Sequence, residues 1–469
     1  MIEAPNIGMQ SIETQNRVPR NGAPAAREIA RDFGRKPGTQ KDPLRGAFFW
    51  LSAFYLVYCS RPEDWIPGLR YLPLAKITGI FAVLGLISSW GKTQRKFKDL
   101  PRESFYLLAL IGVLVPSALL SPIWRGGALL RTLDFAKVYL AFVLTFLLVT
   151  SFQRLRRIIF IQAASVVVVS VVSIILGHSK PRLQGVIGGI YSNPNDLAFA
   201  VVLSVPFCLA FLLISKNFLV KLAWLAGILM MGLTLFMTAS RGGFVTLVVA
   251  GAVALWHFGV RGRRLGLIVG SGFAVVLLLL VAGGPLMKRV KAIEGGASAE
   301  GVGAASAYES YEERKFLMVK ALHGIAEHPL LGLGVRNFQV YSGVWADVHM
   351  TYLQIAVEGG IPSLILYLMF FSRGFRNLRQ LRRRKDLDKH TKLLVGALHS
   401  SMVGFIIGAL FAPEAYQFFP YFAVAYTSTL VATIAEQERG AEPLREESGV
   451  RRFGVVGGNR RPEVATLVR

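Results

Sequence analysis

Three residues that lie far apart in the sequence have the chemistry to bind a phosphate ester and to move a proton. Arg241 lies in the segment TASRGGF, between two apolar blocks with almost no loop, so we expect it at a membrane boundary. Arg314 belongs to a long polar segment, and His349 directly precedes a later apolar block. A guanidinium holds phosphate oxygens through two parallel N–H groups and keeps its charge. Histidine is the usual general base near neutral pH. These residue types suit a clamp on a phosphate-bearing lipid with a base beside it.

Each of these residues also has an ordinary structural explanation. Arg241 could extend to lipid headgroup phosphates at the interface, as long cationic side chains often do. Arg314 could be a solvated charge among the neighbouring glutamates, and His349 could cap the start of a helix. Residue type and spacing alone leave both explanations open for all three positions.

Two further polar motifs lie beside or inside apolar blocks. The motif NPND (193–196) precedes an apolar block, and it predicts Asn195 or Asp196 as the N-cap of the helix that follows. Glu358 lies inside an apolar block, in the sequence VEGG. A carboxylate within a membrane span is a candidate functional group by default, although pairing with an arginine would explain it equally well. We take these three residues as supporting candidates.

A charged trio lies within one apolar block. Arg131, Asp134 and Lys137 are spaced three residues apart, so they can pair along one face of a helix. The trio is either a self-neutralised cluster or part of a polar cavity. In the second case Lys137 is a supporting candidate for the site.

The sequence lacks the residues that several other kinds of function would require. There is no P-loop, which argues against ATP-driven transport by this chain, and no Asp-rich motif for Mg²⁺ stands on the predicted outward side. His323 and His328 are five residues apart, a poor fit to one helix face for a metal pair. Cys59 and Cys208 are too few for a disulfide framework or a cysteine metal site. We expect no cofactor and no metal, so cationic side chains would have to stabilise a diphosphate leaving group.

The elements that must position these residues are membrane helices. Hydrophobic residues make up 53% of the 469 and charged residues 17%, whereas soluble domains have roughly 45–50% and about 25%. The apolar residues form blocks long enough to cross a ~30 Å hydrocarbon core as a helix. Twelve spans are predicted, at 46–60, 71–90, 104–120, 129–150, 158–176, 197–215, 222–239, 243–259, 265–284, 350–372, 393–412 and 419–435. The predicted fold is therefore an all-α polytopic membrane protein.

The net charge of +25 reflects how the chain is oriented across the membrane. In a soluble protein, 53 Lys and Arg against 28 Asp and Glu would favour nucleic acid as a partner. Here 37 of the 53 basic residues lie in alternate connecting segments that share one side of the membrane, and 13 lie in the opposite set. This alternation follows the positive-inside rule. It predicts that both termini are cytoplasmic, and it explains the charge without nucleic acid.

Three regions divide the chain by composition. Residues 1–45 are polar and lack the apolar core of a signal peptide, so we expect a disordered basic cytoplasmic arm. Residues 46–435 are expected to form one transmembrane domain, and 436–469 a cytoplasmic tail. Within the domain, residues 285–349 are expected to form the one long loop on the outward side.

The long loop is expected to contain a helix. Phe316, Val319, Leu322 and Ile325 recur at three-residue spacing, which predicts an amphipathic helix with these side chains on its apolar face. Pro329 and the glycines that follow it end the pattern. Such a helix would lie on the outer leaflet surface or cap a cavity, with Arg314 at its start.

In the order and outward placement of these motifs, the sequence resembles the O-antigen ligase/polymerase superfamily. Members of this superfamily are bacterial inner-membrane glycosyltransferases with a large periplasmic loop late in the chain. The resemblance rests on NPND, SRGG, an arginine that opens the loop helix, P-LLGLGVRNF and a histidine before YLQIAVEGGIP. It covers roughly residues 185–370 and the multi-span framework around them. The segment RPEDWIPGL (61–69) is also similar to a subgroup described as exopolysaccharide or O-antigen polymerases.

The resemblance implies the all-helical fold of the C-type membrane glycosyltransferases and an inner-membrane location. The donor would be a glycan on undecaprenyl diphosphate, whose anomeric carbon is attacked by an acceptor hydroxyl in a metal-independent, inverting reaction. His349 takes the role of the base or acceptor-orienting group, and Arg241 and Arg314 take the role of diphosphate binding. The family often has His-Asn where this chain has His349 and Met350, so a capping or orienting role of that asparagine is not carried over.

Several functions remain open at this point. The first is polymerisation of O-antigen or exopolysaccharide repeat units, and a close alternative is a ligase that transfers glycan to lipid A core or protein. A secondary anion transporter would use intramembrane charges such as Lys137 and Glu358, but the two related halves with interrupted helices that transporters often have are not visible. A non-catalytic assembly scaffold is another alternative. The expected partners are an undecaprenyl-diphosphate-linked oligosaccharide, membrane lipids, a chain-length regulator and a flippase.

Overall fold

The computed structural model of the chain describes residues 42–177, 182–185, 191, 193–272 and 302–453. Throughout these residues the secondary structure is helical, with turns and irregular connections and no strand. Eight of the described helices are long and apolar enough to cross a membrane. The expectation of an all-helical membrane protein is therefore confirmed in its general form.

The helices follow the predicted spans closely. Eleven of the twelve spans coincide with a described helix, and the ninth is described only over 265–272, which are helical. The elements are α2 Arg45–Ser60, α3 Pro62–Trp65, α4 Leu74–Ser88, η1 Trp90–Lys92, η2 Phe97–Asp99, α5 Arg102–Leu119, α6 Arg125–Leu148, α7 Phe152–Leu176, α8 Pro194–Ile214, α9 Phe218–Thr238, α10 Arg241–Leu255, η3 Trp256–Val260, α12 Val302–Glu327, α13 Phe338–Ser342, α14 Thr351–Arg383, α15 Lys389–Gly408 and α16 Phe418–Phe453.

Three predicted spans form helices that differ from ordinary membrane spans. The helices α2 and α4 have 16 and 15 residues, which gives each about 24 Å at 1.5 Å per residue, less than the ~30 Å core. The helix α6 is long enough, with 24 residues, but it carries the charged trio at 131, 134 and 137. The eight helices that qualify are α5, α7, α8, α9, α10 with η3, α14, α15 and α16. The count of twelve spans stays a prediction.

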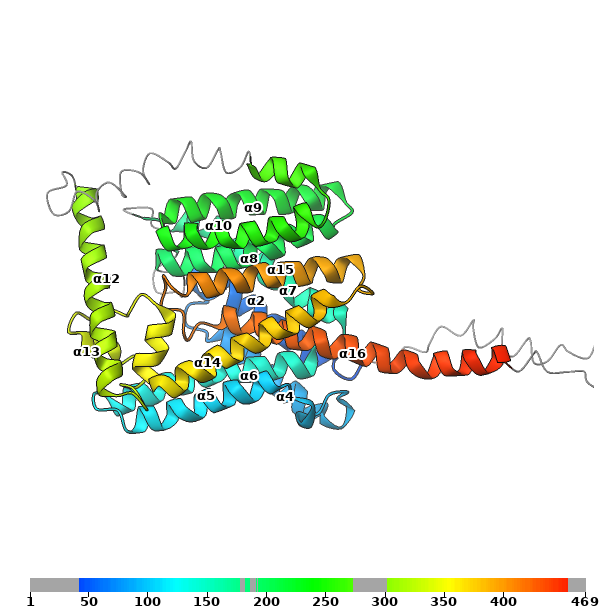
Figure 1. Cartoon of the computed structure of the whole chain (residues 1–469), viewed down its shortest axis with the longest axis horizontal. Helices are drawn as coiled ribbons and strands as arrows, with labels where there is room; N and C mark the ends of the chain where they lie inside the picture. The colour runs from blue at the N-terminus through cyan, green and yellow to red at the C-terminus, as the bar shows by residue number, and fades with distance from the viewer. Residues whose placement is uncertain (1–41, 178–181, 186–190, 192, 273–301, 454–469) are drawn as a thin grey trace, which may run out of the picture.

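The long helices run side by side and α12 lies across one end of them (Figure 1). One part of the bundle contains α8, α9, α10 and α15, and another contains α5, α6 and α14, with α2 and α7 packed between them. We call the end that carries α12 and α13 the α12 end. Because α10, α14 and α16 all begin there, the residues at their first turns can meet (Figure 1).

The predicted loop helix is confirmed as α12, with two differences. The helix begins at Val302, so Arg314 lies in its middle and not at its start. The segment GAASA that precedes the predicted start is rich in alanine, the strongest helix former, which accounts for the longer helix. The predicted apolar face is also wrong in part, because Leu317 and Ala321 are buried against the bundle while Phe316, Val319 and Leu322 are exposed.

A break in α14 joins the long loop to the bundle. Gly360 has φ 77°, a left-handed backbone conformation inside the helix. The carbonyls of Val357 and Glu358 accept hydrogen bonds from the N–H groups of Leu333 (2.8 Å) and Gly334 (2.9 Å). A Cβ atom on Gly360 would lie 2.3 Å from the carbonyl oxygen of Leu330. The glycines of VEGG and GLG therefore allow two backbones to approach closely, which fixes Glu358 next to the loop.

Candidate functional site

The SRGG motif places Arg241 at the first position of α10, at the α12 end. Ser240 is the N-cap, and its side chain accepts a hydrogen bond from the Gly243 N–H at 3.2 Å. The preceding Ala239 is left-handed, which turns the chain sharply from α9 into α10. A Cβ on Gly242 would lie 2.7 Å from Cβ of Phe411, so the glycine lets the 409–415 loop pack against this turn. The motif thus fixes the backbone from which the Arg241 side chain extends.

Asn195 supports this turn from α8. Its Oδ1 accepts hydrogen bonds from the Ser240 hydroxyl at 2.9 Å and from Nη2 of Arg182 at 2.8 Å. The N-cap of α8 is Asn193, whose side chain accepts from the Asn195 N–H, so the prediction of Asn195 or Asp196 as the cap is wrong. Pro194 explains the difference, because proline favours the first helical position and makes the residue before it the cap.

Arg314 lies within electrostatic reach of both Arg241 and His349 at the α12 end. Arg314 lies in the middle of α12, and its Nε is buried with no hydrogen-bond partner among the described residues. Burial and the neighbouring Arg241 lower the pKa of Arg314, while Glu313 opposes them. Two guanidinium groups that approach each other concentrate positive charge at this end of the bundle, which favours the binding of an anion.

His349 lies in the loop just before α14, within electrostatic reach of Arg314. Its Nδ1 is buried and has no hydrogen-bond partner in the described part of the chain. Burial and the charge of Arg314 lower the pKa of His349 to about 4, against the opposing effect of Asp347. The imidazole is therefore neutral at physiological pH and can accept a proton.

Asp347 lies between His349 and a second cation. Its Oδ2 accepts hydrogen bonds from Nη1 of Arg336 at 2.9 Å and from Nε2 of Gln339 at 3.0 Å. Its Oδ1 is buried without a partner among the described residues. Arg336 has φ 64°, which is rare for a residue with a side chain and is often found at functional sites. One carboxylate oxygen of Asp347 is thus fixed by two hydrogen bonds, and the other is able to accept one.

Two buried glutamates and the partly buried Tyr416 complete the interior of the site. Glu358 and Glu414 are 0% and 3% exposed, and both lie within electrostatic reach of Arg336. Burial and the nearby Asp196 raise the pKa of Glu414 well above its usual range, while Arg336 opposes them. The Glu358 carboxylate lies beside the Tyr416 hydroxyl and the backbone N–H of Arg336. Polar atoms are costly to bury without partners, and these groups make the interior of the site polar.

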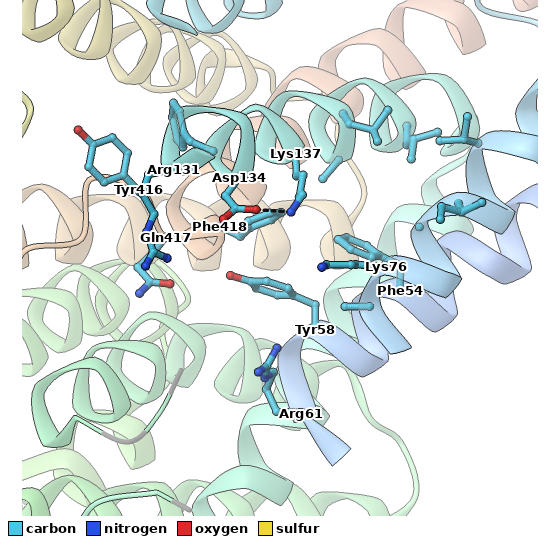
Figure 2. A pocket seen from close by; sticks show the side chains of 18 of the residues that line it. Phe54, Tyr58, Arg61, Lys76, Arg131, Asp134, Lys137, Tyr416, Gln417 and Phe418 are labelled. Atoms are coloured by element: carbon cyan, nitrogen blue, oxygen red, sulfur yellow. Dashed lines mark hydrogen bonds and ion pairs between the residues drawn. The ribbon is translucent and has the colours of Figure 1, made fainter. Parts of the chain in front are cut away.

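A cavity of about 730 Å³ opens next to this interior (Figure 2). Arg336 and Tyr416 line it, and so do all three residues of the charged trio on α6. Lys137 and Asp134 form an ion pair in the cavity wall, as the sequence spacing predicts. Both explanations for the trio therefore hold in part, because Asp134 neutralises Lys137 and all three side chains line the cavity.

The structure gathers most of the predicted residues around one centre. Arg241, Arg314, His349, Asp196 and Glu358 meet at the α12 end, through direct electrostatic contact or through Asp347 and Arg336. Lys137 lies in the adjoining cavity and not in the centre, and Asn195 supports the Arg241 turn.

Four residues of this region were not distinguished by the sequence pattern: Arg182, Arg336, Glu414 and Tyr416. Arg336 belongs to the motif GLGVRNF, and its position after a glycine-rich turn could have marked it as a candidate site residue. Glu414 is a carboxylate between two apolar blocks, and the same rule that selected Glu358 could have selected it. Tyr416 and Arg182 carry no comparable signal in the sequence.

A comparison with known protein families gives a match to this part of the chain. The family described as O-antigen ligase matches residues 226–368. The resemblance to the O-antigen ligase/polymerase superfamily is confirmed. The matched segment contains Arg241, Arg314, His349 and Glu358, whereas Lys137, Asn195 and Asp196 lie outside it.

Comparisons with individual proteins add little. No curated protein matches the chain. A chain from a solved structure described as "Structural coordination of polymerization and crosslinking by a peptidoglycan synthase complex" is 14% identical, with a TM-score of 0.40. The alignment covers 71% of the present chain and 96% of that chain.

The family match and the apolar helices together give a general function. The match over residues 226–368 indicates an O-antigen ligase/polymerase-type function, and together with the eight apolar helices it indicates a bacterial multi-pass membrane protein. This family implies a glycosyltransferase-like enzyme that acts on lipid-linked glycans among membrane lipids.

Proposed function

We propose that the protein polymerises O-antigen or exopolysaccharide repeat units at the periplasmic face of the inner membrane, with donors carried on undecaprenyl diphosphate. The observation that carries this proposal is the convergence of Arg241, Arg314 and His349 at the α12 end. The three residues come from separate elements, and two of them have buried nitrogen atoms without partners in the described residues. Such a set suits a diphosphate leaving group and a proton acceptor beside it.

The proposed orientation places the α12 end in the periplasm and both termini in the cytoplasm. The basic residues support this orientation, since 37 of 53 lie in segments that alternate with those of the α12 end. Residues 46–435 form the transmembrane glycosyltransferase domain in this proposal, with 285–349 as its periplasmic loop. Residues 1–41 and 454–469, which make up most of the proposed basic arm and part of the proposed tail, lie outside the described residues.

Arg241 and Arg314 bind the donor diphosphate in the proposed reaction. The two cations match the two negative charges of a diphosphate diester, and binding relieves the repulsion that lowers the pKa of Arg314. The same contacts strengthen as the bond to the sugar breaks, because negative charge then builds on the diphosphate. The reaction is metal-independent in this proposal, since these side chains supply the positive charge.

His349 accepts the proton of the acceptor. The oxygen of the acceptor hydroxyl forms a bond to the anomeric carbon from the face opposite the leaving group, which inverts the configuration. The bond between this carbon and the diphosphate oxygen breaks, its electron pair stays on undecaprenyl diphosphate, and the hydroxyl proton passes to the neutral imidazole. Asp347, held by Arg336 and Gln339, then stabilises the imidazolium.

The pH dependence of the reaction is expected to follow the charge around His349. Because the neutral imidazole is the active form and its pKa is about 4, kcat/KM should fall only as the pH drops toward that value. Replacing the charged Arg314 by glutamine removes a repulsion, so the pKa of His349 rises and the acidic limb moves to higher pH. The measurement is the pH profile of residual activity for Arg314→Gln. Lys315→Gln removes an exposed charge on the same helix and should leave the acidic limb of the pH profile unchanged. An acidic limb that does not move in Arg314→Gln would contradict the electrostatic effect of Arg314 on His349.

Analysis of lipid-linked intermediates tests the function and separates it from the ligase alternative. In a strain that lacks this gene, a polymerase defect leaves single repeat units on undecaprenyl diphosphate and no long polymer. A ligase defect instead leaves finished polymer on the carrier lipid. We expect single units, restored to polymer by the wild-type gene, and accumulation of undischarged polymer would contradict polymerisation. A chain-length regulator and a flippase are the partners that this function requires.

A further inference from the structure

A second set of cationic side chains lies at the end of the bundle opposite α12, where α10 and α14 end and α15 begins (Figure 1). Nε2 of His257 in η3 lies 2.9 Å from Nδ1 of His399 in α15. Nη1 of Arg382, in the last turn of α14, lies 3.1 Å from Nε2 of His399. Arg261 directly follows η3 and is within electrostatic reach of His257 and Arg382. We call these four residues the His399 cluster.

The backbone around the His399 cluster brings its elements close together. Residues Trp256–Val260 form a π-helix, a local widening of the helix that is frequent at functional sites. A Cβ on Gly396 would lie 3.2 Å from Cβ of His257, so the glycine lets the π-helix pack tightly against α15. His399 follows three residues later on the same face of α15, and the ring of Phe375 from α14 meets its imidazole edge-on. The packing of η3, α14 and α15 therefore holds both imidazoles in place.

The hydrogen bonds determine how the two histidines are protonated. A guanidinium only donates, so Nε2 of His399 accepts from Arg382 and carries no proton. The proton of a neutral His399 then lies on Nδ1, which donates to Nε2 of His257. A proton on Nε2 of His399 would place two donors against each other. Both imidazoles are therefore neutral in this arrangement, and the charge of the cluster comes from Arg261 and Arg382.

The carboxylates close to the cluster in the sequence have other partners. Asp386 pairs with Arg384 at 3.3 Å, and Asp388 accepts hydrogen bonds from the first N–H groups of α15. Among the residues that the structure describes, neither Arg261 nor Arg382 has a carboxylate within ion-pair distance. Two cations that approach each other without a counter-charge favour the binding of an anion.

The depth of the cluster and its apolar surroundings indicate which anion it meets. His257 follows Arg241 by 16 positions in one continuous helical run, which is about 24 Å at 1.5 Å per residue. The cluster therefore lies close to the far boundary of the ~30 Å hydrocarbon core. Trp256 and Leu265 are exposed beside it, and tryptophan is typical of the membrane–water boundary. A phospholipid has a phosphate next to acyl chains at this depth, whereas free phosphate would leave the apolar surface uncovered.

We propose that the His399 cluster binds the phosphodiester headgroup of an anionic phospholipid, in the leaflet at the end opposite α12. This is the inner leaflet in the proposed orientation. Arg261 and Arg382 bind the phosphate oxygens, the histidine pair holds the Arg382 guanidinium in place, and the acyl chains lie against Trp256. The site is separate from the transfer site, so the lipid is a ligand that joins η3, α14 and α15 and not a substrate.

Native mass spectrometry of the purified full-length protein, titrated in detergent with dioleoylphosphatidylglycerol, tests the site. We expect the wild type to bind one molecule more tightly than any further ones. A basic residue near an anionic membrane surface contributes about fivefold to binding, so Arg261→Gln/Arg382→Gln should bind this molecule roughly 25-fold more weakly. Lys216→Gln/Lys221→Gln removes the same charge from exposed positions at the same end of the bundle and should bind it as the wild type does. Size-exclusion elution identical to the wild type shows that each variant is folded.

Three results would overturn the proposal. The first is wild-type affinity in Arg261→Gln/Arg382→Gln, or an equal loss in the lysine variant, because surface charge would then account for the binding. The second is equally tight binding of the zwitterionic dioleoylphosphatidylcholine, which would exclude a site for an anionic lipid. The third is displacement of the bound lipid by inorganic phosphate at equal concentration, which would make free phosphate the ligand. Glycan transfer does not enter this measurement, so each of these results leaves the proposed function standing.

Discussion

Replacing His349 by alanine is expected to lower glycan transfer by roughly 100-fold or more, the usual contribution of a general base. The imidazole is neutral, its Nδ1 is buried without a partner in the described residues, and it lies between Arg314 and Asp347. Alanine cannot accept the hydroxyl proton, so transfer would have to proceed through a poorly activated nucleophile. The readout is the length distribution of surface polysaccharide in a deletion strain that expresses the variant.

The His349 prediction has a matched control on the same side of the molecule. His323 is an exposed histidine on α12 that pairs with Glu327 at 3.2 Å. His323→Ala should give wild-type polymer at the same membrane level of protein. Long polymer in the His349→Ala strain, at normal protein level, would exclude a catalytic role for this residue and leave helix capping as its explanation.

Lysine substitutions of the two arginines are expected to cause losses of similar size. Arg241→Lys and Arg314→Lys keep the charge but lose the planar fork that holds two phosphate oxygens at once. Removing one donor that stabilises a leaving group typically costs roughly 100-fold to 1000-fold in rate. Because both arginines bind one group, the double variant should lose less than the product of the two single losses. The initial rate of transfer by membranes that contain each variant measures the effect.

The alternative explanation of Arg241 predicts a different outcome. An arginine that only reaches lipid headgroups can be replaced by lysine, which extends to the interface in the same way. Full activity of Arg241→Lys would therefore contradict diphosphate binding. Lys315→Arg and Lys320→Arg, on the same helix as Arg314, are controls for general effects of altered cations and should leave the rate unchanged.

Much of the fold could be predicted because long apolar blocks are a strong signal. The helix boundaries of α8, α9 and α15 lie within a few residues of the predicted spans, since the membrane demands long apolar helices there. The face of α12 could not be predicted in the same way. Apolar residues occupy several faces of this helix, and burial of Leu317 and Ala321 is decided by their contacts with Leu333 and Phe338.

The types of the site residues could be predicted, but their mutual placement could not. Arg241, Arg314 and His349 are separated by 73 and 35 positions in the sequence, and only the tertiary arrangement at the α12 end brings them within electrostatic reach of Arg314. The cavity beside the site could not be predicted from the sequence. Lys76 and Arg131 belong to different helices, and neither motif nor spacing connects them, so their common cavity is a property of the tertiary structure.

Purified protein in proteoliposomes shows whether Arg241, Arg314 and His349 form one transfer site. The measurement is release of undecaprenyl diphosphate from extracted lipid-linked repeat units, in the presence of EDTA, with polymer length followed in parallel. We expect release and polymer growth by the wild type, and neither by His349→Ala nor by Arg241→Ala/Arg314→Ala. Equal release by these variants and the wild type, or loss of wild-type release on addition of EDTA alone, would contradict this expectation.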